Sequence, residues 1–218
     1  MGGVSFTDEA RAASAWDDAV GHRFVAELDA GTLDEAVFRD YLERDYAFVE
    51  TLAGHLGHAV ADAPDMAKKR RLADFLSTVV GPEDDYFARS FDTLPGPALD
   101  ETGVDGGAVG ETFADLFAHA AHDGGYAETL AVLVPVEWVY LDWASGIETP
   151  PEPFYHREWV EMHASDDFRA LVGWLRDELD REAEAASDRR RARLERFFTR
   201  AVDLEVAFFD AATRGEGR

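Results

Sequence analysis

The fold is decided by residues 129–144, which read TLAVLVPVEWVYLDWA. A helix that is apolar on every side must lie at the centre of its domain, because each of its faces then needs a covering neighbour. We therefore expect a buried central helix from Tyr126 to Ser145, with a kink at Pro135.

Helical periodicity also dominates on both sides of this run, and alternating β-branched stretches are nearly absent. Thr32 and Glu35 form a capping box that would open a long helix. No repeat and no second domain boundary is evident, so we expect residues 1–218 to form one all-α, multi-helix bundle. The expected helices cover about residues 8–28, 32–60, 64–82, 83–91, 109–122, 126–145, 155–164, 166–179 and 182–213, with the clearest loop at 94–107.

The composition indicates a large core and no membrane segment. Apolar residues make up 46% of the chain and aromatic residues 12%. The N-terminus lacks the basic start and the apolar block of a signal peptide, so we expect a cytoplasmic protein. There is no cysteine, which excludes disulfides, cysteine zinc sites and thiol catalysis.

The chain is strongly acidic, with a formal net charge of −24. A cationic partner is one explanation, and adaptation to high salt is the other. We favour salt adaptation because the acids are spread along the chain and not clustered. This halophilic interpretation predicts that the fold is lost in low salt, and full stability in dilute buffer would contradict it. The same charge repels phosphate backbones, so we expect no nucleic-acid partner.

Three carboxylates fall on apolar stripes, where an ionisable group is the informative exception. Asp45 shares a helix face with Tyr41 and Phe48. Glu137 lies within the most apolar helix, and Glu205 is surrounded by apolar neighbours on the last helix. Each is a candidate functional group. The alternatives are an Asp45 paired with Arg39 or Arg44, a Glu137 neutralised by an Arg or facing solvent, and a Glu205 exposed at the rim of its stripe.

His163 follows Trp159 by one helical turn, and it is either a hydrogen-bonded core residue or part of a site. His55, His58, His119 and His122 form no Glu-x-x-His or HExxH pattern, so we expect no metal. No glycine-rich phosphate loop and no GxSxG elbow is present. We therefore expect neither a nucleotide cofactor nor serine hydrolysis.

Four stretches of the chain resemble, in order, the TenA / thiaminase II family, which has the haem-oxygenase-like helical bundle. Residues 16–49 resemble its Trp…His-x-Phe-Val…Tyr…Asp-Tyr-x-Phe pattern, and residues 127–143 resemble its central Pro-Cys-x-Trp-x-Tyr helix. FYHREWVEMHASDDF resembles Tyr-x-x-x-Trp-(Ile/Val)-x-x-Tyr-x-Ser-x-x-Phe, and RFFTRAVDLEVAFFD resembles the closing Phe…Glu-x-x-Phe-Trp. The resemblance implies an enzyme of thiamin metabolism that acts on an aminopyrimidine, and by the same resemblance a homo-oligomer, commonly a tetramer.

The resemblance also implies roles for individual residues. Asp45 matches the Asp that holds the substrate's amino group, and Glu205 matches the carboxylate that binds and protonates a ring nitrogen. Rigid aromatic walls would hold the flat ring by stacking. The side chains that match or share this wall are Tyr41, Phe48, Phe113, Tyr140 and His163.

Two positions depart from the family pattern: its nucleophilic Cys falls on Val136, and a Tyr near that Cys falls on His163. The thiolate mechanism is therefore excluded. Glu137, Tyr140 and Trp143 resemble the Glu-x-x-Tyr-x-x-Trp of a Cys-lacking subgroup that hydrolyses amino- or formylamino-pyrimidines in thiamin salvage. A pyrimidine-binding or regulatory protein that has lost catalysis is the main alternative. A metal-dependent or quinone-forming oxidative enzyme is a third.

Overall fold

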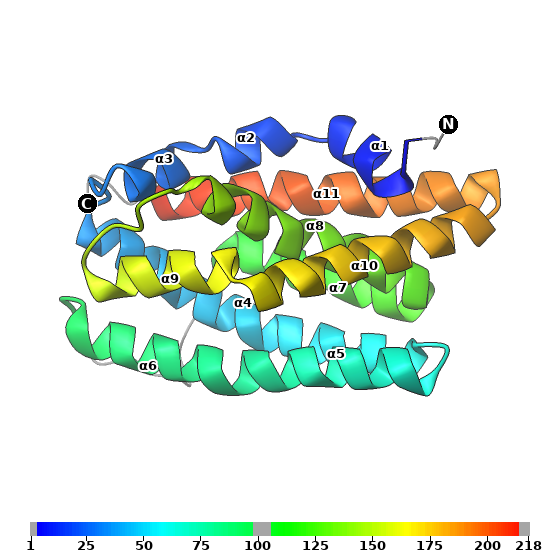
Figure 1. The fold of residues 1–218 in the computed structure, drawn as a ribbon, viewed down its shortest axis with the longest axis horizontal. Coiled ribbons are helices and arrows are strands. Elements are labelled where there is room, and N and C mark those ends of the chain that lie inside the picture. Colours follow the sequence, from blue (N-terminus) through cyan, green and yellow to red (C-terminus); the bar gives the residue numbers. More distant parts are fainter. Residues whose placement is uncertain (1–3, 98–105, 214–218) are drawn as a thin grey trace. The chain divides into compact units, whose positions relative to one another are not determined.

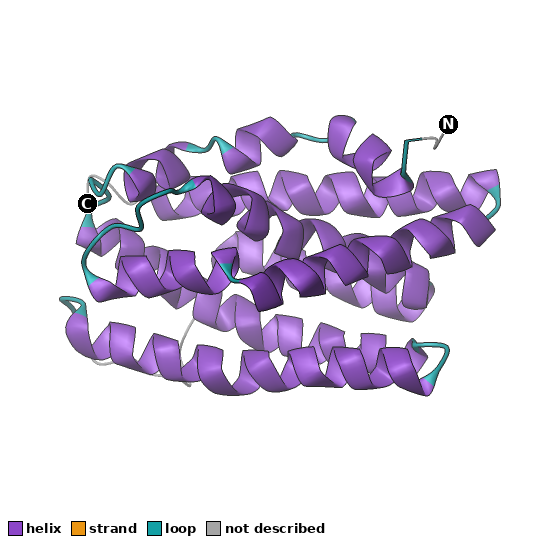
Figure 2. Cartoon of the chain, in the orientation of Figure 1, coloured by secondary structure: helices purple, strands orange, loops and turns teal. Residues whose placement is uncertain are grey.

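The computed structural model describes residues 4–97 and 106–213, and these are helical throughout apart from short connections (Figure 2). The expected all-α class is confirmed. Part of the loop expected at 94–107 lies outside the described residues. The helices are α1 (Phe6–Ala12), α2 (Trp16–Val20), α3 (Arg23–Asp29), α4 (Glu35–Asp62), α5 (Met66–Thr78), the π-helical turn η1 (Val79–Glu83), α6 (Asp84–Thr93), α7 (Gly107–Asp123), α8 (Tyr126–Gly146), α9 (Phe154–Ala164), α10 (Asp166–Ala185) and α11 (Asp188–Thr213).

The central apolar helix is present with the expected bounds as α8, which contains Pro135. Side chains from Leu130 to Val134 are fully buried, and Val136 and Trp138 are nearly so. A helix without a solvent face gains hydrophobic free energy all round, which is why the run at 129–144 needs no amphipathic pattern.

Two compact units are formed by the chain. The first contains the described residues up to Thr32 together with Ala127–Ala207. The second contains Leu33–Tyr126 and the chain from Phe208 onward. Helix α11 therefore contributes its longer part to the first unit and its last turns to the second.

The expected first helix at 8–28 is wrong, because the structure divides it into α1, α2 and α3. Gly21 ends α2, and the next residue, His22, opens α3 by accepting a hydrogen bond at Nδ1 from the Phe24 amide at 3.1 Å. A side-chain cap of this kind satisfies an orphan amide and starts a new helix where periodicity alone would continue the old one.

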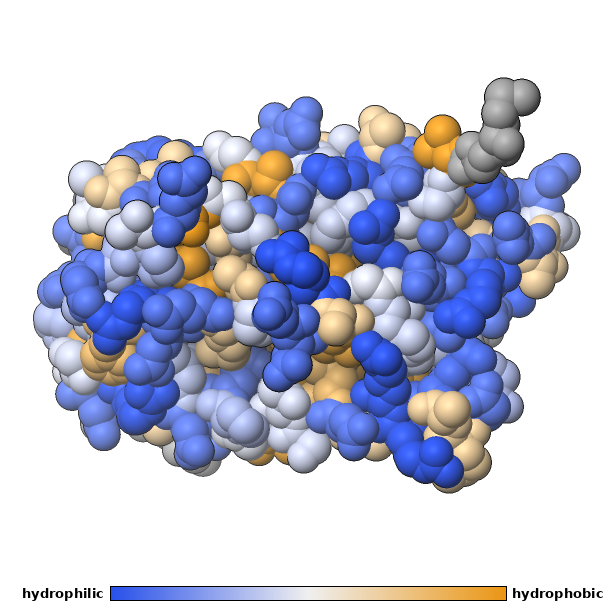
Figure 3. Space-filling view, viewed as in Figure 1, coloured by the Kyte–Doolittle hydropathy of each residue, from blue (hydrophilic) through white to orange (hydrophobic). Residues whose placement is uncertain are grey.

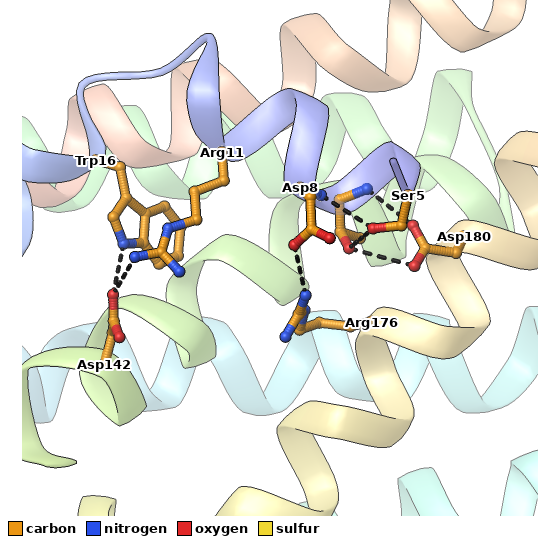
Figure 4. Close-up of polar contacts among 8 residues, drawn as sticks. Ser5, Asp8, Arg11, Trp16, Asp142, Arg176 and Asp180 are labelled. Carbon is orange, nitrogen blue, oxygen red and sulfur yellow. Dashed lines mark hydrogen bonds and ion pairs between the residues drawn. The ribbon is translucent and has the colours of Figure 1, made fainter. Parts of the chain in front are cut away.

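The N-terminal helices are fixed to α8 and α10 by partly buried polar contacts (Figure 4). Asp142 Oδ2 accepts hydrogen bonds from Arg11 Nη2 and from Trp16 Nε1, both at 2.8 Å. On α1, the Thr7 amide donates to Asp180 Oδ1 at 2.8 Å. These contacts position the N-terminal segment against the first unit's long helices, although the segment itself contains only short ones.

We expect Asp142→Ala to lower the free energy of unfolding by about 1–3 kcal/mol. The substitution leaves the Trp16 indole N–H, whose residue is 2% exposed, without an acceptor. Guanidinium-chloride unfolding measures the change. Asp18→Ala is the matched control because Asp18 is exposed on the neighbouring turn. Equal stability of the two variants would contradict the role given to Asp142.

In the second unit, α4 packs along both α5 and α7. The expected capping box is wrong: Asp34, not Thr32, caps α4 by accepting from the Ala36 amide at 2.8 Å. Helix α5 likewise begins at Met66, behind an Asp65 cap, and not in a turn that contains Pro64.

The expected helix end near residues 81–82 is also wrong. Helices α5 and α6 run on through the π-helical turn η1, and Figure 1 shows them as one nearly continuous rod. Pro82 lacks an amide hydrogen, so a widened turn accommodates it where a regular α-helix would lose a hydrogen bond. The boundary between the last two helices falls at residues 186–187 instead of 180–181, where Ser187 precedes α11.

Hydrophilic side chains cover most of the face drawn in Figure 3, with small apolar patches between them. Within residues 4–97 and 106–213, the exposed large apolar side chains are Val4, Met66 and Val80. Among the described residues, no helix is both long and apolar enough to span a membrane.

Candidate active site

Asp45 lies on the buried face of α4, as its spacing from Tyr41 and Phe48 predicts. The exposed fractions of the three residues are 4%, 0% and 8%. Helix periodicity places all three on one stripe, and their low exposure shows that water is largely excluded from it. A carboxyl group thus lies within an aromatic layer.

That layer is built around Phe208, from the end of α11. Its ring centroid lies 5.8 Å from that of Tyr41, 6.1 Å from that of Phe48 and 6.4 Å from that of Phe113. Phe48 and Phe113 also meet edge to face at 5.0 Å. The structure therefore brings together three of the expected aromatic wall residues, with Phe208 as the ring that they share.

Asp45 has no arginine partner in the part of the chain that the structure describes. The guanidinium of Arg44 donates to both oxygens of Asp40, at 2.9 and 3.2 Å. Arg39 pairs with Glu43 at 2.8 Å and donates to the carbonyl oxygens of Leu94 and Pro97, at 3.3 and 2.6 Å. The alternative in which Asp45 pairs with Arg39 or Arg44 is therefore wrong.

Burial raises the pKa of Asp45 well above its ordinary value, and the nearby Glu83 carboxyl raises the pKa further. Glu83 belongs to η1, which packs against α4, and burial raises its own pKa to about 7. Both groups lie where water stabilises charge poorly, so the protonated form of each is favoured. Glu83 could not be found from the sequence, because its effect on Asp45 depends on the packing of η1 against α4.

Glu137 is 7% exposed on α8, between Val136 and Trp138. Its helix face therefore does not reach solvent. One turn later, Tyr140 contacts His163, with ring centroids 4.9 Å apart. Trp143 follows at 5.6 Å from Tyr140 and 6.1 Å from His163. The first unit thus gathers Tyr140, Trp143 and His163 into one aromatic cluster on α8 and α9.

His163 is held as one neutral tautomer. Its Nδ1 lies 2.8 Å from the Trp159 carbonyl oxygen, which can only accept, so Nδ1 carries the hydrogen and Nε2 is left as an acceptor. Burial lowers the pKa of His163 to about 4, against the smaller opposing effect of that hydrogen bond. Nearby, the buried Nε1 of Trp143 has no hydrogen-bond partner among the described residues. The cluster thus offers an acceptor at His163 Nε2 and a donor at Trp143 Nε1.

We expect His163→Gln to reduce the loss of stability in acid. The unfolded chain takes up a proton at His163 below about pH 6.5, whereas the folded chain resists it down to about pH 4. Stability from this group is present above pH 6.5 and is lost as pH falls to about 4, by at most about 3 kcal/mol. Urea unfolding between pH 4 and 7 measures the slope. The exposed His119→Gln is the control, and identical slopes for the two variants would refute the assignment.

Glu205 is 2% exposed on α11, in a turn shared with the fully buried Val202. Phe208 and Phe209 follow it by three and four residues. The alternative of an exposed Glu at the rim of the stripe is therefore wrong. Asp45, Glu137 and Glu205 are all buried. Glu128 and Glu178 are buried as well, but they pair with Arg190 and Arg181.

Among the described residues, no group of three or more His, Asp or Glu side chains is placed to hold a metal ion. A pocket of about 440 Å³ opens beside α1 and α2, and Arg11 and Trp16 are among its lining residues. None of the expected site residues lines this pocket.

The fold defines an all-α protein, with buried carboxyl groups on helices that also carry packed aromatic rings. The chain belongs to the TENA/THI-4/PQQC family, whose model matches residues 9–215. This confirms the family expected from the four sequence stretches.

Relatives and solved structures agree with this assignment. The aminopyrimidine aminohydrolase of Halalkalibacterium halodurans is 25% identical over 206 residues, which are 93% of this chain and 92% of that protein. The aminopyrimidine aminohydrolase of Bacillus subtilis is 24% identical over 218 residues, 98% and 92% of the two chains. A TenA homologue from P. horikoshii OT3 superposes with a TM-score of 0.86 at 25% identity, covering 97% of this chain and all 100% of that one.

Proposed function

We propose that this protein hydrolyses an aminopyrimidine in thiamin salvage, cleaving a C–N bond of an amino- or formylamino-methylpyrimidine to give hydroxymethylpyrimidine. The proposal is supported by relatives named aminopyrimidine aminohydrolase, each matched over most of its length. The observation that carries it here is the burial of three carboxylates at the positions that the family resemblance assigns to the substrate and the reaction.

Two of the carboxylates would bind the ring. Asp45 would accept a hydrogen bond from the exocyclic amino group, and Glu205 would hydrogen-bond or protonate a ring nitrogen and so make the ring an electron sink. The edge-to-face aromatic layer of Tyr41, Phe48 and Phe113 would hold the flat ring by dispersion and quadrupole contacts. Tyr140 and His163 would contribute to the wall on α8 and α9.

Glu137 would perform the proton transfers of the hydrolysis. With Val136 at the position of the family's nucleophilic Cys, water must attack in place of sulfur, and Glu137 is the adjacent carboxylate. It would act as a general base on that water, or as a general acid toward the leaving amine. We place the protein in the Cys-lacking subgroup on this basis.

Loss of the Cys also favours a second candidate, a pyrimidine-binding protein of the same fold without catalysis. One experiment separates the two. If the function is hydrolysis, hydroxymethylpyrimidine raises the melting temperature, and the amino or formylamino compound is turned over. A binding protein gives the thermal shift, about 2.7 kcal/mol at a hundredfold excess over Kd, without turnover. If neither a thermal shift nor turnover is observed, both candidates are excluded.

We also propose a cytoplasmic protein adapted to high salt, without a metal or nucleotide cofactor. The net charge of −24 supports the salt adaptation and opposes binding to nucleic acid. A homo-oligomer, commonly a tetramer in this family, is the expected assembly.

A further inference from the structure

Trp143 carries a buried hydrogen-bond donor that the mechanism above does not use. The residue is 3% exposed on α8, and its indole Nε1–H has no hydrogen-bond partner among the described residues. The indole of Trp16, by contrast, donates to Asp142 at 2.8 Å. A buried N–H without an acceptor is costly, and such groups are rare in native proteins unless something outside the chain accepts from them.

His163, on α9, supplies an acceptor next to this donor. Its ring centroid lies 6.1 Å from that of Trp143, and the two ring planes are inclined by 36°. The residue is 7% exposed. Its hydrogen bond to the Trp159 carbonyl uses Nδ1, so Nε2 carries no hydrogen and can only accept. Burial lowers the pKa of His163 to about 4, which keeps the ring neutral at pH 7.

The surrounding rings fix the positions of both groups. The centroid of Tyr140 lies 4.9 Å from that of His163 and 5.6 Å from that of Trp143. Two further rings meet His163 edge to face, Trp159 at 4.4 Å and Phe168 at 5.2 Å. All five residues belong to the first unit. Packed rings have little freedom to rotate, so the donor and the acceptor are preorganised for one kind of polar group.

We propose that Trp143 and His163 form a subsite for a neutral amide, which selects the formylamino-methylpyrimidine over the aminomethylpyrimidine. This inference rests on the proposed function. The formyl oxygen would accept from Trp143 Nε1, and the amide N–H would donate to His163 Nε2. The subsite lies on the same helix as Glu137, which precedes Trp143 by six residues.

The selectivity follows from the groups that each substrate offers. An amide has one acceptor and one donor, which match the two polar atoms of the subsite. An aminomethyl group is protonated at pH 7 and has donors only, so the Trp143 N–H stays unpaired when it binds. A carboxylate or a phosphate has acceptors only, so it leaves His163 Nε2 unpaired. A site that is built to hydrogen-bond one group rejects an analogue without it, because its own buried polar atoms then lose their partners.

Trp143→Phe keeps an aromatic ring and removes the donor. In the full-length protein in high salt, we expect kcat/KM for the formylamino compound to fall about tenfold, the value of one hydrogen bond, and kcat/KM for the amino compound to stay within about twofold. His163→Phe, which keeps a flat ring without an acceptor, should shift the ratio in the same direction. The loss of each compound, followed by liquid chromatography, measures the two values.

Trp16→Phe is the matched control, because the Trp16 N–H already has an acceptor in Asp142. It should leave the ratio of the two kcat/KM values unchanged. Intrinsic reactivity differs between the two compounds but cancels when a variant is compared with the wild type. An equal loss for both compounds in Trp143→Phe would mean that Trp143 is structural, and it would overturn the proposal while leaving the proposed function in place.

NMR of the indole N–H groups tests the subsite without a pyrimidine. The chain has five tryptophans, and the signal that disappears in Trp143→Phe belongs to Trp143. We expect this signal to shift saturably with N-methylformamide and not with methylammonium. No shift, or an equal response to methylammonium, would overturn the proposal. If N-methylformamide shifts the signal but neither pyrimidine is bound or turned over, the proposed function fails and the amide subsite stands.

Discussion

Glu137→Gln is expected to lower kcat for aminopyrimidine hydrolysis by about 10²–10⁴-fold, the usual contribution of general acid–base catalysis. Gln keeps the size and a hydrogen-bonding end but cannot exchange a proton with water or with the leaving amine. The affinity for hydroxymethylpyrimidine should stay near the wild-type value, because Glu137 is assigned to the reaction and not to the ring. Steady-state kinetics and calorimetry measure the two quantities.

Glu128→Gln is the matched control for this variant. Glu128 lies on the same helix, α8, and is 2% exposed, but its carboxylate accepts two hydrogen bonds from Arg190, at 3.1 and 2.8 Å. We expect the control to lose about 1–3 kcal/mol of stability while kcat is unchanged. A Glu137→Gln enzyme with full activity would refute the assignment of Glu137.

Asp45→Ala is expected to weaken aminopyrimidine binding by about 10- to 100-fold, the value of one hydrogen bond to a charged group. The same change should raise the free energy of unfolding at pH 8. Because burial and Glu83 raise the pKa of Asp45, the stability that its protonated form gives is present in acid and is lost as pH rises. Without the carboxyl group, stability no longer falls as pH rises, so the variant is more stable than the wild type at pH 8. Calorimetric binding and urea unfolding at pH 5 and pH 8 measure both effects.

The control for this variant is Asp40→Ala on the same helix. Asp40 is paired with Arg44 near the surface, so its loss should leave binding unchanged and cost at most about 1 kcal/mol of stability. If Asp45→Ala binds as well as this control, Asp45 does not hold the substrate. If it is less stable than the wild type at pH 8, the carboxyl group is structural.

The buried central helix could be predicted from the sequence, but several of the helix boundaries could not. Helix α8 is an apolar run without a competing signal, so its bounds are as expected. The division at His22 depends on a side chain that caps a backbone amide, and helical periodicity does not record such a cap. Pro82 does not end the helix as a proline usually would, because the π-helical turn accommodates a residue without an amide hydrogen.

The candidate site could also be predicted only in part: residues on one helix could be found, and features that depend on tertiary packing could not. The stripe of Tyr41, Asp45 and Phe48 could be predicted because it repeats with the period of one helix. Glu83 could not, because its effect on the pKa of Asp45 arises only when η1 packs on α4. The tautomer of His163 also depends on geometry, since the Trp159 carbonyl fixes the hydrogen on Nδ1.

Hydrolysis in water enriched with oxygen-18 tests the central claim most directly. The full-length protein is incubated in high salt with the aminomethylpyrimidine, and the products are followed by mass spectrometry and an ammonia assay. We expect one ammonia for each hydroxymethylpyrimidine formed, with the heavy oxygen on the exocyclic carbon. Substrate that is bound but returned unchanged, without ammonia, would contradict it.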